Sequence, residues 1–127
     1  MRTVKRYGIE TGLIVNIADL SGMFAWTDFS VHGISKAGII HLTTISARAL
    51  APDIRVNCIA PGAVMPGPDQ PRNSPGFLEI SERLPVKRVG HQHNVAQTVV
   101  FYATNDFVTG EVLTVDGGEH LLGPYGH

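Results

Sequence analysis

The sequence predicts an α/β fold with a parallel sheet of about three strands, and two observations predict it. Three short apolar runs rich in β-branched residues end at glycine, proline or aspartate, as strands do. Between them lie segments whose apolar residues recur every three or four positions, the spacing of a helix. Strands that alternate with helices form parallel sheets with right-handed crossovers.

The elements expected in the first half of the chain follow from local patterns. The run 13–18 is apolar apart from Asn16 and predicts a strand buried on both faces. A loop follows over 21–29 and contains Trp26, the only tryptophan. Helical spacing then extends over 30–51, and Pro52 stops that helix.

The second half repeats the alternation of strands and helices. A strand is predicted at 54–59, and a loop rich in proline and glycine follows it. Two helices come next, and Asn94 is the expected N-cap of the second. The last strand closes at Asp116-Gly117-Gly118, which we interpret as a structural turn. The predicted ranges are the loop 62–75, the helices 76–84 and 94–105, and the strand 111–115.

Composition places the chain among single-domain proteins and excludes several classes. The 127 residues are 43% hydrophobic with a net charge of −1, enough to bury a core. Scattered Lys and Arg argue against nucleic acid or a membrane surface as the main partner. No apolar run reaches the roughly 18 residues of a membrane span, and Met1–Arg6 is no signal peptide. Cys58 is the only cysteine, so a reduced, cytoplasmic setting is expected.

Four phrases, "GLIVNIAD", "SKAGIIHLT", "IRVNCIAPGAV" and "TGEVLTVDGG", occur in this order along nearly the whole chain. Together they resemble the C-terminal half of the short-chain dehydrogenase/reductase family. The resemblance implies a doubly wound, Rossmann-type sheet of about seven strands, of which residues 1–127 supply the last three as a single partial domain. The glycine-rich turn that cradles the dinucleotide's pyrophosphate is not in the sequence, so the N-terminal dinucleotide-binding half is expected to be absent.

The resemblance also implies candidate catalytic residues. In this family a Tyr lies four residues before a Lys on one face of a helix. The Lys charge lowers the pKa of the phenol, so that it exchanges a proton with the substrate oxygen, and the Lys also binds the nicotinamide ribose. Lys36 is the matching lysine, His32 stands at the tyrosine position, and Asp19 replaces a serine that orients the carbonyl group.

Both replacements leave alternatives open. Asp19 resembles the pteridine-reductase-like branch, in which this carboxyl group helps to protonate a ring nitrogen and therefore needs a raised pKa. Alternatively, Asp19 only caps a turn or a helix. His32 can relay protons, because imidazole titrates at about pH 6.5, if Asp19 offsets the charge of Lys36. Alternatively, His32 marks a site that no longer turns over.

The expected cofactor is NADP or NAD, with NADP favoured, and the chain alone is expected to bind it poorly. Pro61, Gly62, Ala63 and Val64 match the family loop whose backbone meets the nicotinamide carboxamide, where glycine allows close approach. Pro66 stands near a family threonine and lacks its hydroxyl group and N–H. A metal site is not predicted, because His91-Gln92-His93 has no further ligand at metal-binding spacing.

Two functions remain open from the sequence. The first is an NAD(P)(H)-dependent oxidoreductase that transfers hydride to a carbonyl or pterin-like substrate, with this chain as its substrate and proton-relay half. The alternative is a truncated, non-catalytic homologue that acts only as an oligomerisation module or relic. Either function predicts a homo-oligomer formed through the 30–51 helix and the C-terminal strand region.

Overall fold

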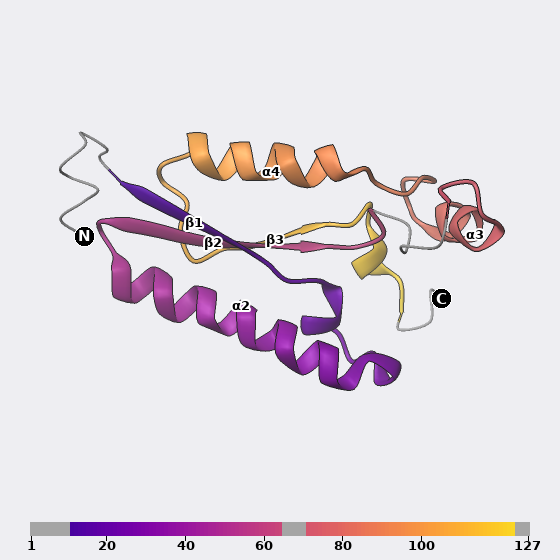
Figure 1. The fold of residues 1–127 in the computed structure, drawn as a ribbon, viewed down its shortest axis with the longest axis horizontal. Coiled ribbons are helices and arrows are strands. Elements are labelled where there is room, and N and C mark those ends of the chain that lie inside the picture. The colour runs from indigo at the N-terminus through magenta and orange to yellow at the C-terminus, as the bar shows by residue number, and fades with distance from the viewer. Residues whose placement is uncertain (1–10, 65–70, 124–127) are drawn as a thin grey trace.

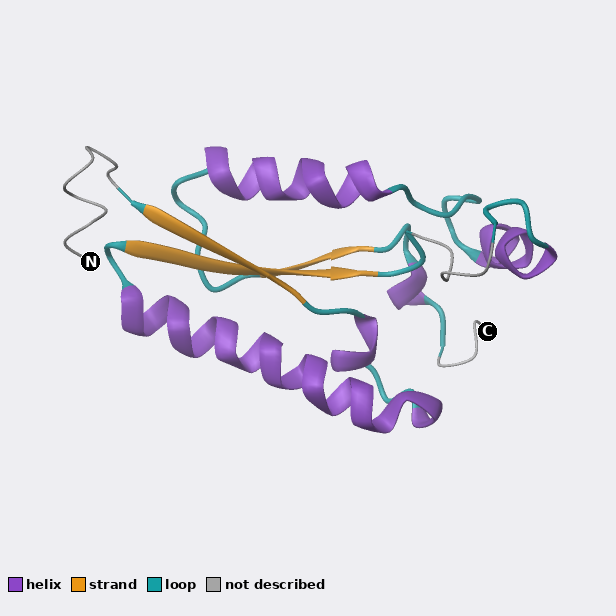
Figure 2. Ribbon diagram, in the orientation of Figure 1, coloured by secondary structure: helices purple, strands orange, loops and turns teal. Residues whose placement is uncertain are grey.

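The computed structural model describes residues 11–64 and 71–123, and it confirms the predicted α/β fold. Three parallel strands form one sheet in the order β1-β2-β3. The long helix α2 covers one face and α4 covers the other, while α3 lies beyond the end of the sheet at which the strands finish (Figures 1 and 2). The bounds are β1 Gly12–Ile17, α2 Ser30–Leu50, β2 Ile54–Pro61, α3 Pro75–Arg83, α4 Gln92–Thr104 and β3 Val112–Val115.

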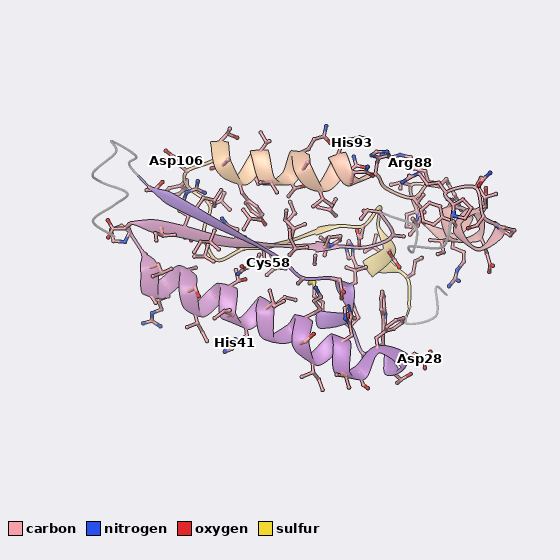
Figure 3. All side chains as sticks on the ribbon, viewed as in Figure 1. Asp28, His41, Cys58, Arg88, His93 and Asp106 are labelled. Atoms are coloured by element: carbon pink, nitrogen blue, oxygen red, sulfur yellow. The ribbon has the colours of Figure 1, made fainter. Side chains whose placement is uncertain are left out.

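The central strand β2 forms the core. Its residues from Arg55 to Ala60 are all buried, because β1 and β3 pair with its two edges and the helices cover its faces. Cys58 lies on the side of α2, where Thr43 and Ala47 are also buried (Figure 3). Arg55 and Asn57 are buried together with the apolar residues, so the burial of β2 does not follow the alternation of apolar and polar residues at its start.

Two local predictions in the first half of the chain differ from the structure. The segment predicted as a loop contains two 3₁₀ helices, η1 at Leu20–Gly22 and η2 at Thr27–Phe29. β1 is not buried on both faces, since Ile14 and Ile17 are 39% and 44% exposed. Within the described residues β1 pairs with β2 alone, so it is an edge strand of the sheet.

The prediction that Asn94 caps α4 is also wrong. His91 is the N-cap, and Asn94 occupies the third helical position. The two residues form a capping box. The Asn94 side chain accepts from the N–H of His91 at 2.9 Å, and the N–H of Asn94 donates to the His91 side chain. The helix therefore begins two residues earlier than the sequence pattern indicates.

A buried arginine joins α4 to the sheet. The side chain of Arg55 on β2 donates through Nη1 to three carbonyl oxygens, those of Tyr102 in the last turn of α4, of the C-cap Asn105 and of Val108 in the loop beyond, at 2.8, 3.0 and 3.1 Å. The last carbonyls of a helix have no partner within the helix. Arg55 supplies one, and its positive charge also suits the helix C-terminus.

Tyr102 anchors the same helix and gives a prediction for alkaline pH. Its hydroxyl group donates to the carbonyl oxygen of Cys58 at 2.8 Å, and burial, followed by the charges of Cys58 and Glu111, raises its pKa to about 12. The folded state therefore keeps this proton longer than the unfolded state. The stability that Tyr102 contributes should be complete below pH 10 and should be lost as the pH rises towards 12.

The measurement is urea unfolding of the wild type and Tyr102→Phe between pH 8 and 12. At pH 8 the variant should be less stable by about 1 kcal/mol, the value of one hydrogen bond. The difference should shrink as the pH rises, because only the wild type loses this stabilisation. A difference that stays constant up to pH 12 would contradict the raised pKa.

None of the helices within residues 11–64 and 71–123 is both long and apolar enough to cross a membrane.

Candidate functional site

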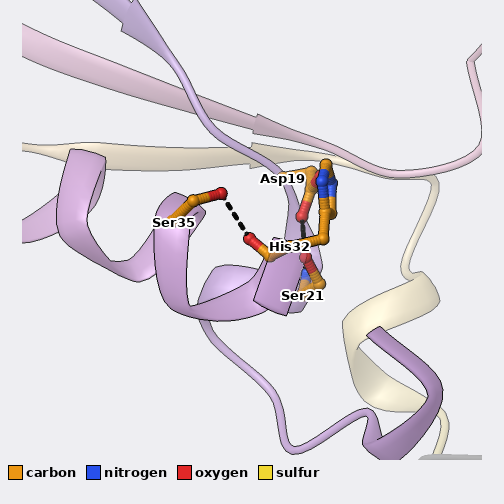
Figure 4. Close-up of polar contacts among 4 residues, drawn as sticks. All are labelled: Asp19, Ser21, His32 and Ser35. Atoms are coloured by element: carbon orange, nitrogen blue, oxygen red, sulfur yellow. Dashed lines mark hydrogen bonds and ion pairs between the residues drawn. The ribbon is translucent and has the colours of Figure 1, made fainter. Parts of the chain in front are cut away.

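Asp19 lies directly beyond the carboxyl end of β1, where it caps the short helix η1. Its Oδ1 accepts from the N–H of Ser21 at 2.8 Å and from the Ser21 hydroxyl group (Figure 4). The capping interpretation of Asp19 is thus confirmed. It leaves the second carboxylate oxygen, Oδ2, for a different partner.

That partner is His32, in the first turn of α2. Its Nε2 lies 2.5 Å from Oδ2 of Asp19 (Figure 4). About half of the His32 side chain (51%) and 28% of the Asp19 side chain are exposed, so the pair borders solvent. The carboxylate that the sequence hypothesis required beside His32 is therefore present.

Two glycines allow this approach. A Cβ at Gly33 of α2 would lie 2.7 Å from the carbonyl oxygen of Ser21, and a Cβ at Gly22 of η1 would lie 2.8 Å from the backbone N of Ala37. Such distances are closer than real side chains adopt. The backbones of η1 and α2 therefore touch directly, and this contact positions His32 beside Asp19.

The hydrogen bonds of the pair set the state of Asp19. Burial raises its pKa, but the hydrogen bonds from Ser21 and His32 outweigh burial, and the pKa lies below its ordinary value of 3.8. This shift is opposite to the raised pKa that proton donation by Asp19 requires. Asp19 is a carboxylate at neutral pH, and because a carboxylate only accepts, the hydrogen between the two groups belongs to Nε2 of His32.

Lys36 lies one turn beyond His32 on α2 and is half-buried. Burial raises the pKa of the Cys58 thiol, and the Lys36 charge opposes that rise, so the ammonium group lies within electrostatic reach of Cys58. It forms no hydrogen bond or ion pair with the residues that the structure describes. Lys36 therefore lies on the same helix as His32 but forms no hydrogen bond or ion pair with either residue of the Asp19–His32 pair.

The predicted nicotinamide loop follows β2 to the same end of the sheet. Pro61, Gly62 and Ala63 line one pocket of about 220 Å³ together with Asp19 and His32; we call it the inner pocket. Val64 instead faces a separate pocket beside Gly90 and Thr114. Pro66 and the other residues of 65–70, within the predicted loop 62–75, lie outside the described residues.

The inner pocket also contains residues that sequence reasoning missed: Trp26, Phe29 and Glu119. Glu119 is the acidic one among them. Its Oε2 accepts from the N–H of Ala63 at 3.0 Å, across 56 positions of sequence. Its only local signal is an acid directly after Asp116-Gly117-Gly118, a turn interpreted as structural alone.

The histidine pair at the start of α4 lies in none of the pockets that contain these residues. Nδ1 of His91 and Nδ1 of His93 are 2.9 Å apart, and His93 points away from the sheet (Figure 3). Within the described ranges, no three His, Cys, Asp or Glu side chains are grouped so that they could hold a metal ion.

The sequence of the chain is similar to those of known enzymes. The sequence family described as enoyl-(acyl carrier protein) reductase matches residues 1–120. The 3-oxoacyl-[acyl-carrier-protein] reductase FabG of Thermotoga maritima is 34% identical over 112 residues, 86% of this chain and 46% of that protein.

Two solved structures share the fold. FolM alternative dihydrofolate reductase 1 from Brucella suis, in complex with NADP, matches with a TM-score of 0.76 and 36% identity over 88% of this chain and 44% of its own. A short chain dehydrogenase from Leptospira borgpetersenii with bound NAD⁺ matches with a TM-score of 0.73 and 33% identity, over 92% and 47% of the two chains. The chain thus spans about half the length of these relatives, and it belongs to the short-chain dehydrogenase/reductase family.

Proposed function

We propose that the chain forms the substrate-facing and proton-transfer part of an NAD(P)(H)-dependent oxidoreductase that transfers hydride to a carbonyl or pterin-like substrate. The observation that carries this proposal is the inner pocket. It combines an acid–base pair, Asp19 and His32, with the backbone of Pro61–Ala63 at the carboxyl ends of β1 and β2. Ligands of open parallel α/β sheets bind at this edge.

In this proposal His32 supplies the proton. The Asp19 carboxylate, 2.5 Å from Nε2, stabilises a charged imidazolium and keeps a hydrogen on that nitrogen. In the imidazolium Nδ1 carries a second proton, which can move to the substrate oxygen as negative charge develops there. Lys36, one turn along α2, is proposed to bind the ribose, because its ammonium has no partner among the described residues.

A nicotinamide group, when bound, supplies the hydride. The residues that would hold it are Pro61, Gly62 and Ala63, whose backbone leaves β2 and lines the inner pocket beside the Asp19–His32 pair. The relatives from Brucella suis and Leptospira borgpetersenii contain NADP and NAD⁺ respectively, which supports either dinucleotide. A pterin-like substrate is supported by the 36% identity to the Brucella suis reductase.

The test is a NADPH titration monitored by nicotinamide fluorescence. It uses the 127-residue chain and a chimera in which the chain replaces the matching part of the Brucella suis relative. We expect a saturable change with the chimera, weak binding by the chain alone, and NADPH oxidation when a dihydropterin or a ketone is added. A chimera that binds NADPH but oxidises it with neither substrate class would overturn the proposed activity.

A second candidate function, association without catalysis, is favoured by one observation. The outer face of α2 carries large apolar side chains in water, of which Val31 is 82% and Ile34 is 74% exposed. Exposed apolar patches of this kind mark interaction sites. We propose that two copies of the chain pair through α2, and the C-terminal strand region is the second proposed contact.

Ile34→Glu should abolish this pairing, because it would bury a charge in the interface. Sedimentation velocity should show a dimer or tetramer for the wild type and a smaller species for the variant, because only the contact through the C-terminal strand region is left. Asp28→Glu serves as the control, since it changes an exposed residue that already carries a charge. A wild type that sediments as a monomer at micromolar concentration would refute association through α2.

A further inference from the structure

A second pocket of about 220 Å³ adjoins the inner pocket, and we call it the outer pocket. It is lined by residues 25–29, by the end of α3 and by the segment that follows β3. Three side chains line both pockets: Trp26, Phe29 and Glu119. A ligand that extends from one pocket into the other must therefore pass these three side chains.

Glu119 is held firmly at this shared border. Its Oε2 accepts from the N–H of Ala63 at 3.0 Å, and its own N–H donates to the carbonyl oxygen of Asp116 at 3.1 Å. A Cβ at Gly62 would collide with Oε2, so only glycine lets the carboxyl group lie against this loop. Glu119 is thus held both at its backbone and at one carboxylate oxygen, so its side chain is not free to turn into solvent.

The surroundings of this carboxyl group are mainly apolar. Trp26, Phe29 and Leu84 are among the lining residues of the outer pocket. Arg83 also lines it, and its positive charge acts on the Glu119 carboxyl group. Burial, and then the charge of Asp116, raise the pKa of Glu119, whereas the Ala63 N–H and Arg83 lower it. Desolvation is therefore already the largest influence on this group before any ligand binds.

A carboxylate can accept about four hydrogen bonds, and the Ala63 N–H takes one position. An apolar ligand that fills the pocket removes water from the remaining positions and offers no hydrogen bond in its place. A ligand that carries a hydroxyl or N–H group replaces that water with a hydrogen bond. Sites of this kind reject the analogue that lacks the donor.

We propose that Glu119 is a specificity-determining residue, whose carboxyl group selects substrates that carry a hydroxyl or N–H donor on an apolar ring body packed against Trp26 and Phe29. The proposal concerns the same site as the proposed function and rests on it, because only that function makes the bound ligand a substrate. The preference itself concerns binding and requires neither cofactor nor turnover.

The experiment uses two probes that differ in one donor, 4-(4-hydroxyphenyl)butan-2-one and its methyl ether. Trp26 is the only tryptophan of the chain and lines both pockets, so its fluorescence reports their occupancy. Titration of the 127-residue chain, excited beyond the absorption of the phenol, should show that the hydroxyl probe binds about tenfold more tightly than the ether.

Glu119→Gln is the decisive variant, because it keeps the size of the side chain. Its amide oxygen can still accept from Ala63, which leaves an NH₂ donor for the ligand. The preference for the hydroxyl probe should therefore disappear or reverse. Glu119→Ala should bind both probes alike, and Glu79→Gln, on the exposed side of α3, should keep the wild-type preference.

Equal affinity of the wild type for the two probes would overturn the proposal. So would a preference that survives in Glu119→Gln, or the absence of any fluorescence change with either probe. These outcomes are separate from the proposed activity: a clear preference in the chain, combined with a chimera that never oxidises NADPH, would leave Glu119 as a selector and reject only the reaction.

Discussion

Arg55→Met should destabilise the chain by about 3 kcal/mol, a large part of the roughly 5–15 kcal/mol that holds a small domain together. The substitution removes a charged donor from three carbonyl oxygens, those of Tyr102, Asn105 and Val108. Each hydrogen bond to a charged group contributes about 1.5–3 kcal/mol, and a buried carbonyl left unpaired costs more than one in water.

Part of this loss is offset. The buried charge itself is costly, and Nε of Arg55 is already buried without a hydrogen-bond partner. Methionine fills most of the volume that the arginine leaves. We therefore expect a value near 3 kcal/mol rather than the sum of three separate hydrogen bonds.

Urea unfolding followed by circular dichroism measures the effect. Arg48→Met is the matched control, because Arg48 is an exposed arginine in the last turn of α2 and should cost at most about 1 kcal/mol. If the two variants unfold at the same urea concentration, Arg55 does not hold α4 against the sheet as its contacts indicate.

His32→Gln should lower the kcat of the NADP-binding chimera by about 10²-fold or more, the usual contribution of a general acid. Glutamine can still donate to the Asp19 carboxylate, so the pocket should keep its shape. What is lost is the imidazole that is proposed to give its proton to the substrate oxygen. The effect should appear in kcat rather than in the affinity for NADPH.

His32→Tyr is the companion variant, because it restores the residue that the family resemblance expects. We expect its kcat to lie within about tenfold of the unmodified chimera, with a pH profile displaced towards the higher pKa of a phenol. Full activity of His32→Gln at neutral pH would exclude His32 as the proton donor. Because Asp19 is held as a carboxylate, the proton would then have to come from another group or from water.

The candidate site was predicted unevenly from the sequence. Proton relay by His32 requires the Asp19 carboxylate beside it, and the contact is present because both residues lie where a strand end and a helix start meet at one edge of the sheet. The expected rise of the Asp19 pKa was not found. Local sequence does not reveal that the Ser21 hydroxyl and N–H both donate to the same carboxylate.

The amino-acid sequence by itself determined the order of strands and helices and the position of Lys36 one turn after His32, since hydrophobic period and helical spacing depend on near neighbours. Only the tertiary structure decided the contact between Ala63 and Glu119. That contact joins residues 56 positions apart and depends on the pairing of β2 with β3 and on the missing side chain of Gly62. No local pattern records either requirement, because both exist only once the sheet has formed.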